Sequence, residues 1–195
     1  MLSEVIKTAL ERALERMKDF KEVSAGEINA LEHGPRGRAL GASFLKEADF
    51  DIVAALKDFD SGVLPYIKGG VEETLLLNIM LPGSEEDFNV SRRAMEGIYS
   101  IKQETAAAGE VLGQMGQLLN QYRQAQAQAL ENFKRDFEME VRLTRRQTRQ
   151  RPGAGGELPE RLPGFREEWG KVQSSLDAQF LGALNALKDS LREIK

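Results

Sequence analysis

Apolar residues recur at helical spacing at the start of the chain. They are separated by four, three, four and three positions, and most residues between them are charged. These apolar positions are Ile6, Leu10, Ala13, Met17 and Phe20. Ser3 precedes them as a candidate N-cap, so the pattern predicts an amphipathic helix that ends near Phe20.

Several short helices are expected between this first helix and residue 82. Ser24 and Glu27 have the spacing of a capping box, and Gly34-Pro35 should end the helix that they start. Pro65 and Gly69-Gly70 predict further interruptions. The result would be a lobe of short helices.

The apolar run at residues 71–81 fits either a buried strand or a helix. No other segment offers a strand partner, and a lone strand would leave its backbone groups unpaired. We therefore expect a helix here, followed by a break at Pro82-Gly83.

The longest periodic segment begins at Ser84, a capping residue followed by three acidic residues at the positive end of the helix dipole. Apolar or uncharged residues then alternate in steps of three and four. This stripe comprises Ile98, Ile101, Thr105, Ala108, Leu112, Met115, Leu119, Tyr122, Gln126, Ala129 and Phe133. Sustained over several heptads, it predicts one continuous, coiled-coil-like helix over residues 83–151.

A linker and a last helix complete the chain. Residues 152–164 contain Pro152, Pro159, Pro163 and four glycines, so we expect no helix there. Residues 165–195 carry another apolar stripe and should pack back on the long helix as an antiparallel hairpin. The predicted fold class is all-α: a long-helix coiled coil or antiparallel helical hairpin, with residues 1–82 as a lobe formed by the first amphipathic helix and the short helices.

The centre of the long helix is almost free of charge. Between Thr105 and Leu130 only Glu110 and Arg123 are ionised, whereas glutamine occupies six positions. Three glycines share one face there, although each costs a helix about 0.5–1 kcal/mol relative to alanine. We therefore expect a helix-packing interface in which a second backbone approaches closely. The expected interface residues are Gly109, Gly113, Gly116, Leu112, Met115, Leu119, Tyr122 and Gln126.

Arginines gather at the end of the long helix. The cluster contains Arg142, Arg145, Arg146 and Arg149 on one side of the helix, with no acid among them. Such a cluster could bind the phosphates of a nucleic acid or another anionic partner. It could equally be the cationic end that a helix C-terminus favours. The net charge of −4 argues against nucleic-acid binding by the whole molecule, so this function is the alternative.

The sequence predicts no catalytic, cofactor or metal site. There is no cysteine, and His33, the single histidine, has no partner arrangement typical of a catalyst. The segment that begins at Asp58 lacks the glycine and glutamate of a calcium loop. No apolar run is long enough to cross a membrane, and no signal peptide is apparent. We expect a cytoplasmic protein that is not an enzyme.

The segment from Ile6 to Arg16, followed by short helices and the 75–82 segment, resembles a family of small uncharacterised bacterial helical proteins. The resemblance implies a bacterial cytoplasmic protein and carries over no activity or site residues. The expected function is that of a non-enzymatic helical assembly or scaffold protein. Its partner would be a second copy of the chain or another protein, bound through the charge-poor helix.

Overall fold

The computed structural model describes residues 24–147, 162 and 164–194, without the side chains of residues 144–147. Every regular element in these ranges is a helix, which confirms the all-α fold class. The helices are α2 (Ala25–Lys46), α3 (Ile52–Leu56), α4 (Leu64–Leu77), α5 (Glu85–Ile101), α6 (Thr105–Gln147) and α7 (Phe165–Glu193). The amphipathic helix predicted before Ser24 and most of the 152–164 linker lie outside the described residues.

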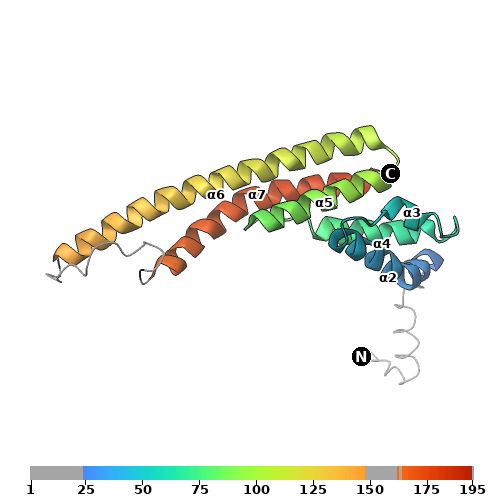
Figure 1. The fold of residues 1–195 in the computed structure, drawn as a ribbon, viewed down its shortest axis with the longest axis horizontal. Coiled ribbons are helices and arrows are strands. Elements are labelled where there is room, and N and C mark those ends of the chain that lie inside the picture. The colour runs from blue at the N-terminus through green and yellow to red at the C-terminus, as the bar shows by residue number, and fades with distance from the viewer. Residues whose placement is uncertain (1–23, 148–161, 163, 195) are drawn as a thin grey trace, which may run out of the picture.

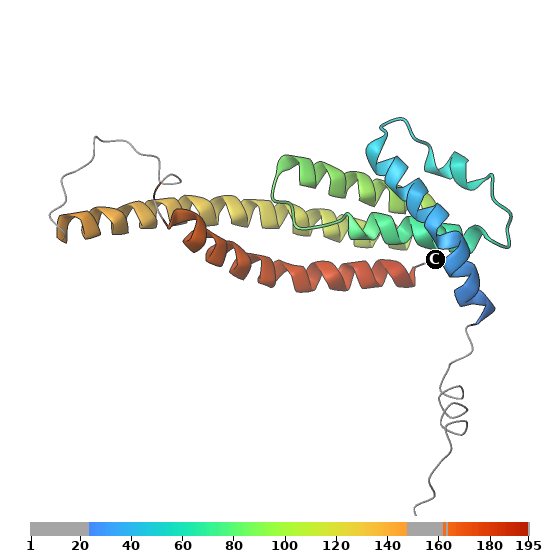
Figure 2. The ribbon, with the colours of Figure 1, turned by 90° about the horizontal axis from the view of Figure 1, so that it is seen from below.

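The described part of the molecule has a lobe at one end and a long arm (Figure 1). The lobe consists of α2, α3 and α4, and the arm consists of α5, α6 and α7. Figure 2 shows α6 between α5 and α7, with α5 much shorter than its two neighbours. One continuous core joins the parts, because Val71 and Leu75 of α4 and Ile98 of α5 are buried in the same cluster as Leu119 of α6 and Leu184 of α7.

Helix α2 begins as predicted but does not end where expected. Ser24 and Glu27 form the capping box, with the Glu27 backbone N–H donating to Ser24 Oγ at 3.2 Å. The helix then continues through Gly34-Pro35 to Lys46, so the predicted end at Gly34-Pro35 was wrong. Pro35 is exposed, and Leu31, whose carbonyl loses its helical donor to the proline, is 74% exposed. Water can therefore replace the missing N–H at this position.

Helix α4 settles the ambiguity at residues 71–81. It extends to Leu77, which confirms the helical interpretation over most of the segment. The predicted interruptions at Pro65 and Gly69-Gly70 were wrong. Pro65 lies in the first turn, where a missing N–H costs nothing, and the two glycines are inside the helix.

The long helix predicted over residues 83–151 is two helices, and the prediction of one continuous helix was wrong. Helix α5 ends at Ile101, and Lys102 has an extended backbone with φ −75° and ψ 142°. Helix α6 then returns antiparallel to α5, so that Arg123 reaches Glu85 at the start of α5. The return allows Ile98 and Ile101 to share one core with α6. The stripe is therefore buried from Ile98 to Tyr122 except at Thr105, but it is divided between two helices and is only half-buried beyond Tyr122.

Helix α7 packs back on α6, which confirms the predicted antiparallel hairpin. Tyr122 contacts Phe180 near the middle of α6, and Phe133 contacts Trp169 farther along. Contact positions therefore advance along α6 as they go back along α7. Helix α5 reaches α6 only as far as about Arg123, so α6 and α7 continue alone beyond that residue.

Candidate helix-packing interface

The apolar residues predicted for the interface are buried within the chain. Met115 and Leu119 are fully buried, Tyr122 is 1% exposed, and Leu112 is 9% exposed. Three of these four residues belong to the cluster that joins α5, α6 and α7. This side of α6 is therefore occupied and has no surface left for a second molecule.

Tyr122 forms the main polar contact inside the arm. Its ring packs edge-on against Phe180 at 5.4 Å between centroids, and its hydroxyl donates to Asp177 Oδ1 at 2.5 Å. Burial raises the pKa of Tyr122, and the hydrogen bond to the Asp177 carboxylate raises it further. Gln126 extends the contact, because its Nε2 donates to the Tyr122 hydroxyl at 3.5 Å. The phenol thus fixes the register of α6 against α7.

The three glycines predicted for the interface lie away from this core. A Cβ atom built on Gly113 or Gly116 would have no neighbour within 4 Å, and one built on Gly109 would meet only the ring of Tyr99, at 3.5 Å. Tyr99 itself is 48% exposed. Within the described chain no second backbone approaches these glycines. The sequence correctly placed them on one face, but the structure separates that face from the four apolar residues.

The outward surface of α6 around the glycines carries almost no charge. The exposed side chains here are uncharged amides, namely Gln114, Gln117, Asn120, Gln121, Gln124 and Gln128. Of the two ionised residues, Arg123 is neutralised by an ion pair with Glu85 and lies over the ring of Phe88 at 4.4 Å. Only Glu110 adds charge to the exposed surface of this stretch. We call the surface formed by Gly109, Gly113, Gly116, Gln117 and Asn120 the glycine face.

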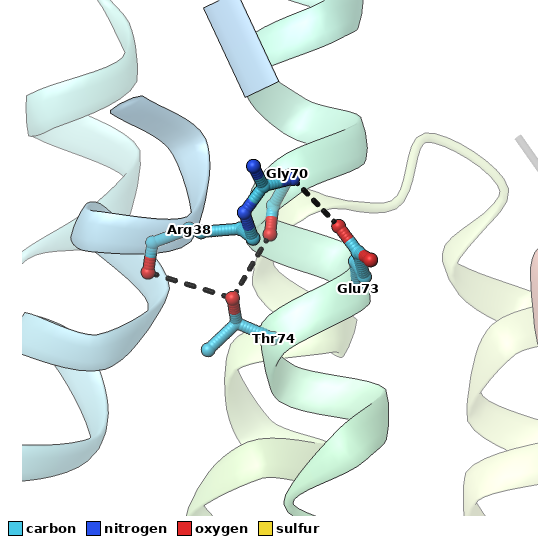
Figure 3. A network of polar contacts seen from close by, with 4 residues as sticks. All are labelled: Arg38, Gly70, Glu73 and Thr74. Atoms are coloured by element: carbon cyan, nitrogen blue, oxygen red, sulfur yellow. Dashed lines mark hydrogen bonds and ion pairs between the residues drawn. The ribbon is translucent and has the colours of Figure 1, made fainter. Parts of the chain in front are cut away.

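Within the described chain, a close approach of two backbones occurs between α2 and α4. A Cβ on Gly37 would lie 1.9 Å from the carbonyl oxygen of Ile67, and one on Gly70 would lie 2.2 Å from that of Gly34. Figure 3 shows the polar contacts beside this crossing. Arg38 Nη1 forms an ion pair with Glu73 at 3.1 Å, and the Thr74 hydroxyl lies 3.1 Å from the Gly70 carbonyl oxygen and 3.4 Å from that of Arg38. Gly34 and Gly70, which the sequence predicts as helix breakers, lie inside helices and make this contact possible.

A buried lysine that sequence analysis missed lies where the lobe meets the arm. The side chain of Lys102 is 4% exposed, forms an ion pair with Glu72 of α4 at 2.8 Å, and donates to the carbonyl of Ile194 after α7. A cleft of about 520 Å³ opens beside it, with Lys68 and Arg192 on its walls. Through these contacts Lys102 links α4 to the C-terminal end of α7. Nothing in the local sequence marks Lys102 as buried, because Gln103 and Glu104 follow it directly.

The arginine cluster is only partly described. Arg142 Nη2 forms an ion pair with Glu138, one helical turn earlier, at 2.6 Å, and its side chain is 70% exposed. Arg145 and Arg146 lie in α6, but their side chains are outside the described residues, as is Arg149 altogether. The described residues therefore do not test whether the four guanidinium groups form one site, and anion binding stays a prediction.

The described residues contain no group of three or more histidine, cysteine, aspartate or glutamate side chains that could hold a metal ion. His33 lines a shallow cleft of about 590 Å³ beside Arg36 and Asp58. None of the helices in the described ranges is long and apolar enough to span a membrane.

The geometry defines a class of protein: an elongated helical protein in which three antiparallel helices form an arm on a small helical lobe. Residues 53–193 match the family of unknown function DUF6657, and the chain belongs to that family. No curated protein and no solved structure matches significantly. The match includes α4 to α7, whereas α2 and the residues before it lie outside the matched range.

Proposed function

We propose that this protein is a non-enzymatic assembly protein, and that copies of it associate through the glycine face of α6. The observation that carries the proposal is the open space above Gly113 and Gly116. The opposite side of the same helix is buried against α5 and α7, so these glycines are not needed for packing inside the described chain. They would instead let the backbone of a second α6 approach closely.

The charge pattern supports association between like surfaces. Two identical faces repel when each carries unpaired charge, but the glycine face carries uncharged amides and small residues. Amide side chains can both donate and accept hydrogen bonds, so a row of them can pair with a copy of itself. A two-fold arrangement of two α6 helices would place each glycine face on the other.

The proposed setting is the bacterial cytoplasm. It follows from the resemblance carried by the segment from Ile6 to Arg16 and from the absence of cysteine in the chain. It stays a prediction.

Light scattering on the purified protein tests the association, because one chain has a mass of 21.7 kDa. The wild-type protein should form an oligomer, and Gly113→Leu should shift it toward the monomer because the added side chain forces the backbones apart. Gly113→Ala should weaken the oligomer less. Gly182→Leu is the matched control, since Gly182 is also exposed, lies in α7, and has no neighbour within 4 Å.

Two results would reject the proposal. A monomeric wild-type protein would mean that the glycine face does not mediate self-association. An oligomer that Gly113→Leu and Gly182→Leu leave equally intact would place the contact on another surface.

A further inference from the structure

Helix α2 has apolar residues on two opposite sides. Its inner side packs on α4 through the buried residues Gly34, Gly37 and Gly41, with Phe44 also buried. Its outer side carries a second row of apolar residues, spaced by three or four positions and all exposed. This outer face consists of Ala25, Ile28, Leu31, Pro35, Ala39 and Ala42.

The outer face has no partner among the described residues. Ile28 is 52% exposed and Leu31 is 74% exposed, although both are large aliphatic side chains. A helix that is apolar on both sides is normally covered on both sides. The inner face is covered by α4, so the outer face is incomplete in the described part of the chain.

We propose that residues 3–20 of the same chain cover the outer face of α2 as an antiparallel helix. The sequence gives this segment an apolar stripe of its own, formed by Ile6, Leu10, Ala13, Met17 and Phe20. A helix of this length alone in water is only marginally stable, so the stripe requires a surface to pack on. The chain enters α2 at its N-cap Ser24, directly beside the outer face.

The lengths and the connection fit this arrangement. Residues 3–20 and the outer face at 25–42 span equal numbers of residues, each about 27 Å long at the rise of an α-helix. Residues 21–23 are left as the connection before Ser24, which suits the short loop of an αα-hairpin. The same segment needs no second chain in order to reach this surface.

The side-chain sizes also fit when the two stripes are aligned about the connection. Equal distances from the turn place Phe20 opposite Ala25, Ala13 near Leu31, and Ile6 opposite Ala39. At these three positions a large residue meets a small one, which is the alternation that lets two helix surfaces interdigitate. Met17 and Ile28, two large residues, lie opposite each other in this register.

Cysteine cross-linking tests the arrangement directly, because the chain contains no cysteine. The full-length double variant Met17→Cys/Ile28→Cys should form a disulfide within one chain under mild oxidation. A short connection gives an effective concentration of about 1 mM, so at about 1 μM protein the intrachain product should exceed the interchain product roughly a thousandfold. The control is Glu15→Cys/Ile28→Cys, since Glu15 is on the opposite side of the predicted helix from Met17.

Each outcome on a non-reducing gel decides the question. A fast intrachain disulfide for the Met17 pair, with slow formation for the Glu15 pair, supports the proposal. A covalent dimer would mean that the outer face binds a second copy and would overturn it. Equal rates for both pairs would show that residues 3–20 have no fixed position on α2, and would also overturn it.

Hydrogen exchange on the full chain provides a second measurement. Residues 3–20 should exchange more slowly than an unstructured peptide, and Leu31→Asp should remove that protection. Leu77→Asp is the control, because Leu77 is a similarly exposed leucine, at 65%, on α4. Unprotected amides in the wild-type protein would reject the proposal. The result is independent of self-association through α6, which a different helix and a different variant test.

Discussion

The glycines of this protein lie in two different environments, one closely packed and one open. At Gly37 and Gly70 the missing side chain is required, because the backbones of α2 and α4 are in direct contact. At Gly113 and Gly116 there is open space in the described chain. In the sequence Gly37 and Gly113 look alike, since each has another glycine three or four positions before it and after it in the same helix. The two environments differ only in whether another helix packs against the glycine, and the local sequence does not show which helices will be neighbours.

The crossing of α2 and α4 should not tolerate even one added methyl group. In Gly37→Ala the new carbon would overlap the Ile67 carbonyl oxygen, so the helices must separate, at a cost of about 1–3 kcal/mol. Gly69→Ala is the matched control in α4. It has no neighbour within 4 Å, so alanine should stabilise the helix by about 0.5–1 kcal/mol. Urea unfolding of both variants measures this difference, and equal stabilities would contradict the described crossing.

The Tyr122 phenol should make the protein sensitive to alkaline pH. Its pKa is raised in the folded state, so its contribution to stability is complete below its unfolded pKa of about 10 and is lost as the pH rises toward the folded value. Above pH 10 the unfolded chain releases the proton while the folded chain retains it. The free energy of unfolding should therefore fall.

Thermal unfolding between pH 8 and pH 11 checks this prediction. Tyr122→Phe should be less stable than the wild type at pH 8, because Asp177 loses its donor, and the gap should narrow as the pH rises. Tyr99→Phe is the control, since Tyr99 is 48% exposed. A constant gap between wild type and Tyr122→Phe would show that the phenol does not titrate as described.

At the scale of helices, the sequence predicted the buried faces of the helices better than the residues at which they begin and end. Ile98, Ala108 and Met115 were expected on one buried stripe, and all three are fully buried. The spacing of apolar residues reveals such a face, because only the side of a helix that packs on the core has to be apolar. The ends were missed where they depend on tertiary contacts. Residues 99–104 contain neither glycine nor proline, so nothing local announces the turn at Lys102.

In the candidate interface, too, the sequence predicted what depends on one helix and missed what depends on its neighbours. The sequence identified the charge-poor surface and the shared face of Gly109 and Gly113, which are properties of a single helix. It could not separate these glycines from Leu112 and Tyr122, because that depends on where α5 and α7 pack. Lys102 and Glu72 are thirty positions apart, so their ion pair left no pattern in the sequence.

The ion pair at the α5–α6 turn should hold the two parts of the molecule together. Lys102→Met leaves Glu72 without its cation and the Ile194 carbonyl without its donor, so it should destabilise the protein by about 1–3 kcal/mol. The double variant Lys102→Met/Glu72→Met should recover part of that loss, because it leaves no unpaired carboxylate. Denaturant unfolding of the single and double variants measures the coupling. Strictly additive effects would show that the pair contributes nothing.

At the scale of the whole molecule, the arm buries fewer of its apolar side chains with increasing distance from the lobe. Leu119 is fully buried where three helices meet, Phe133 is half-buried where α6 and α7 continue, and Met139 and Leu143 are more than half exposed. Local stability depends on the apolar contacts that an opening breaks. The end of α6 should therefore open far more often than its middle.

Native-state hydrogen exchange should reveal this gradient. Amides near Met115 and Leu119 should exchange only by global unfolding, and those near Met139 and Leu143 should exchange by local opening. Phe133→Ala should speed exchange near Met139 more than near Met115, because Phe133 packs on Phe137 and Trp169 at the boundary. Uniform exchange rates along α6 would contradict the described packing.

Helix α5 is the arm helix that packs on the lobe (Figure 1), so its angle sets the direction of the whole arm. Gly97 of α5 would bring a Cβ within 2.8 Å of both Phe44 and Leu75, so α5 is closely seated on the lobe. Helix α6 is 43 residues long, or about 64 Å at the rise of an α-helix. A rotation of α5 by about 5° would swing the far end of such a rod by about 6 Å. A small change in the angle between α5 and the lobe would thus move the far end of α6 by several ångströms, which is enough to change its contacts with a neighbouring molecule.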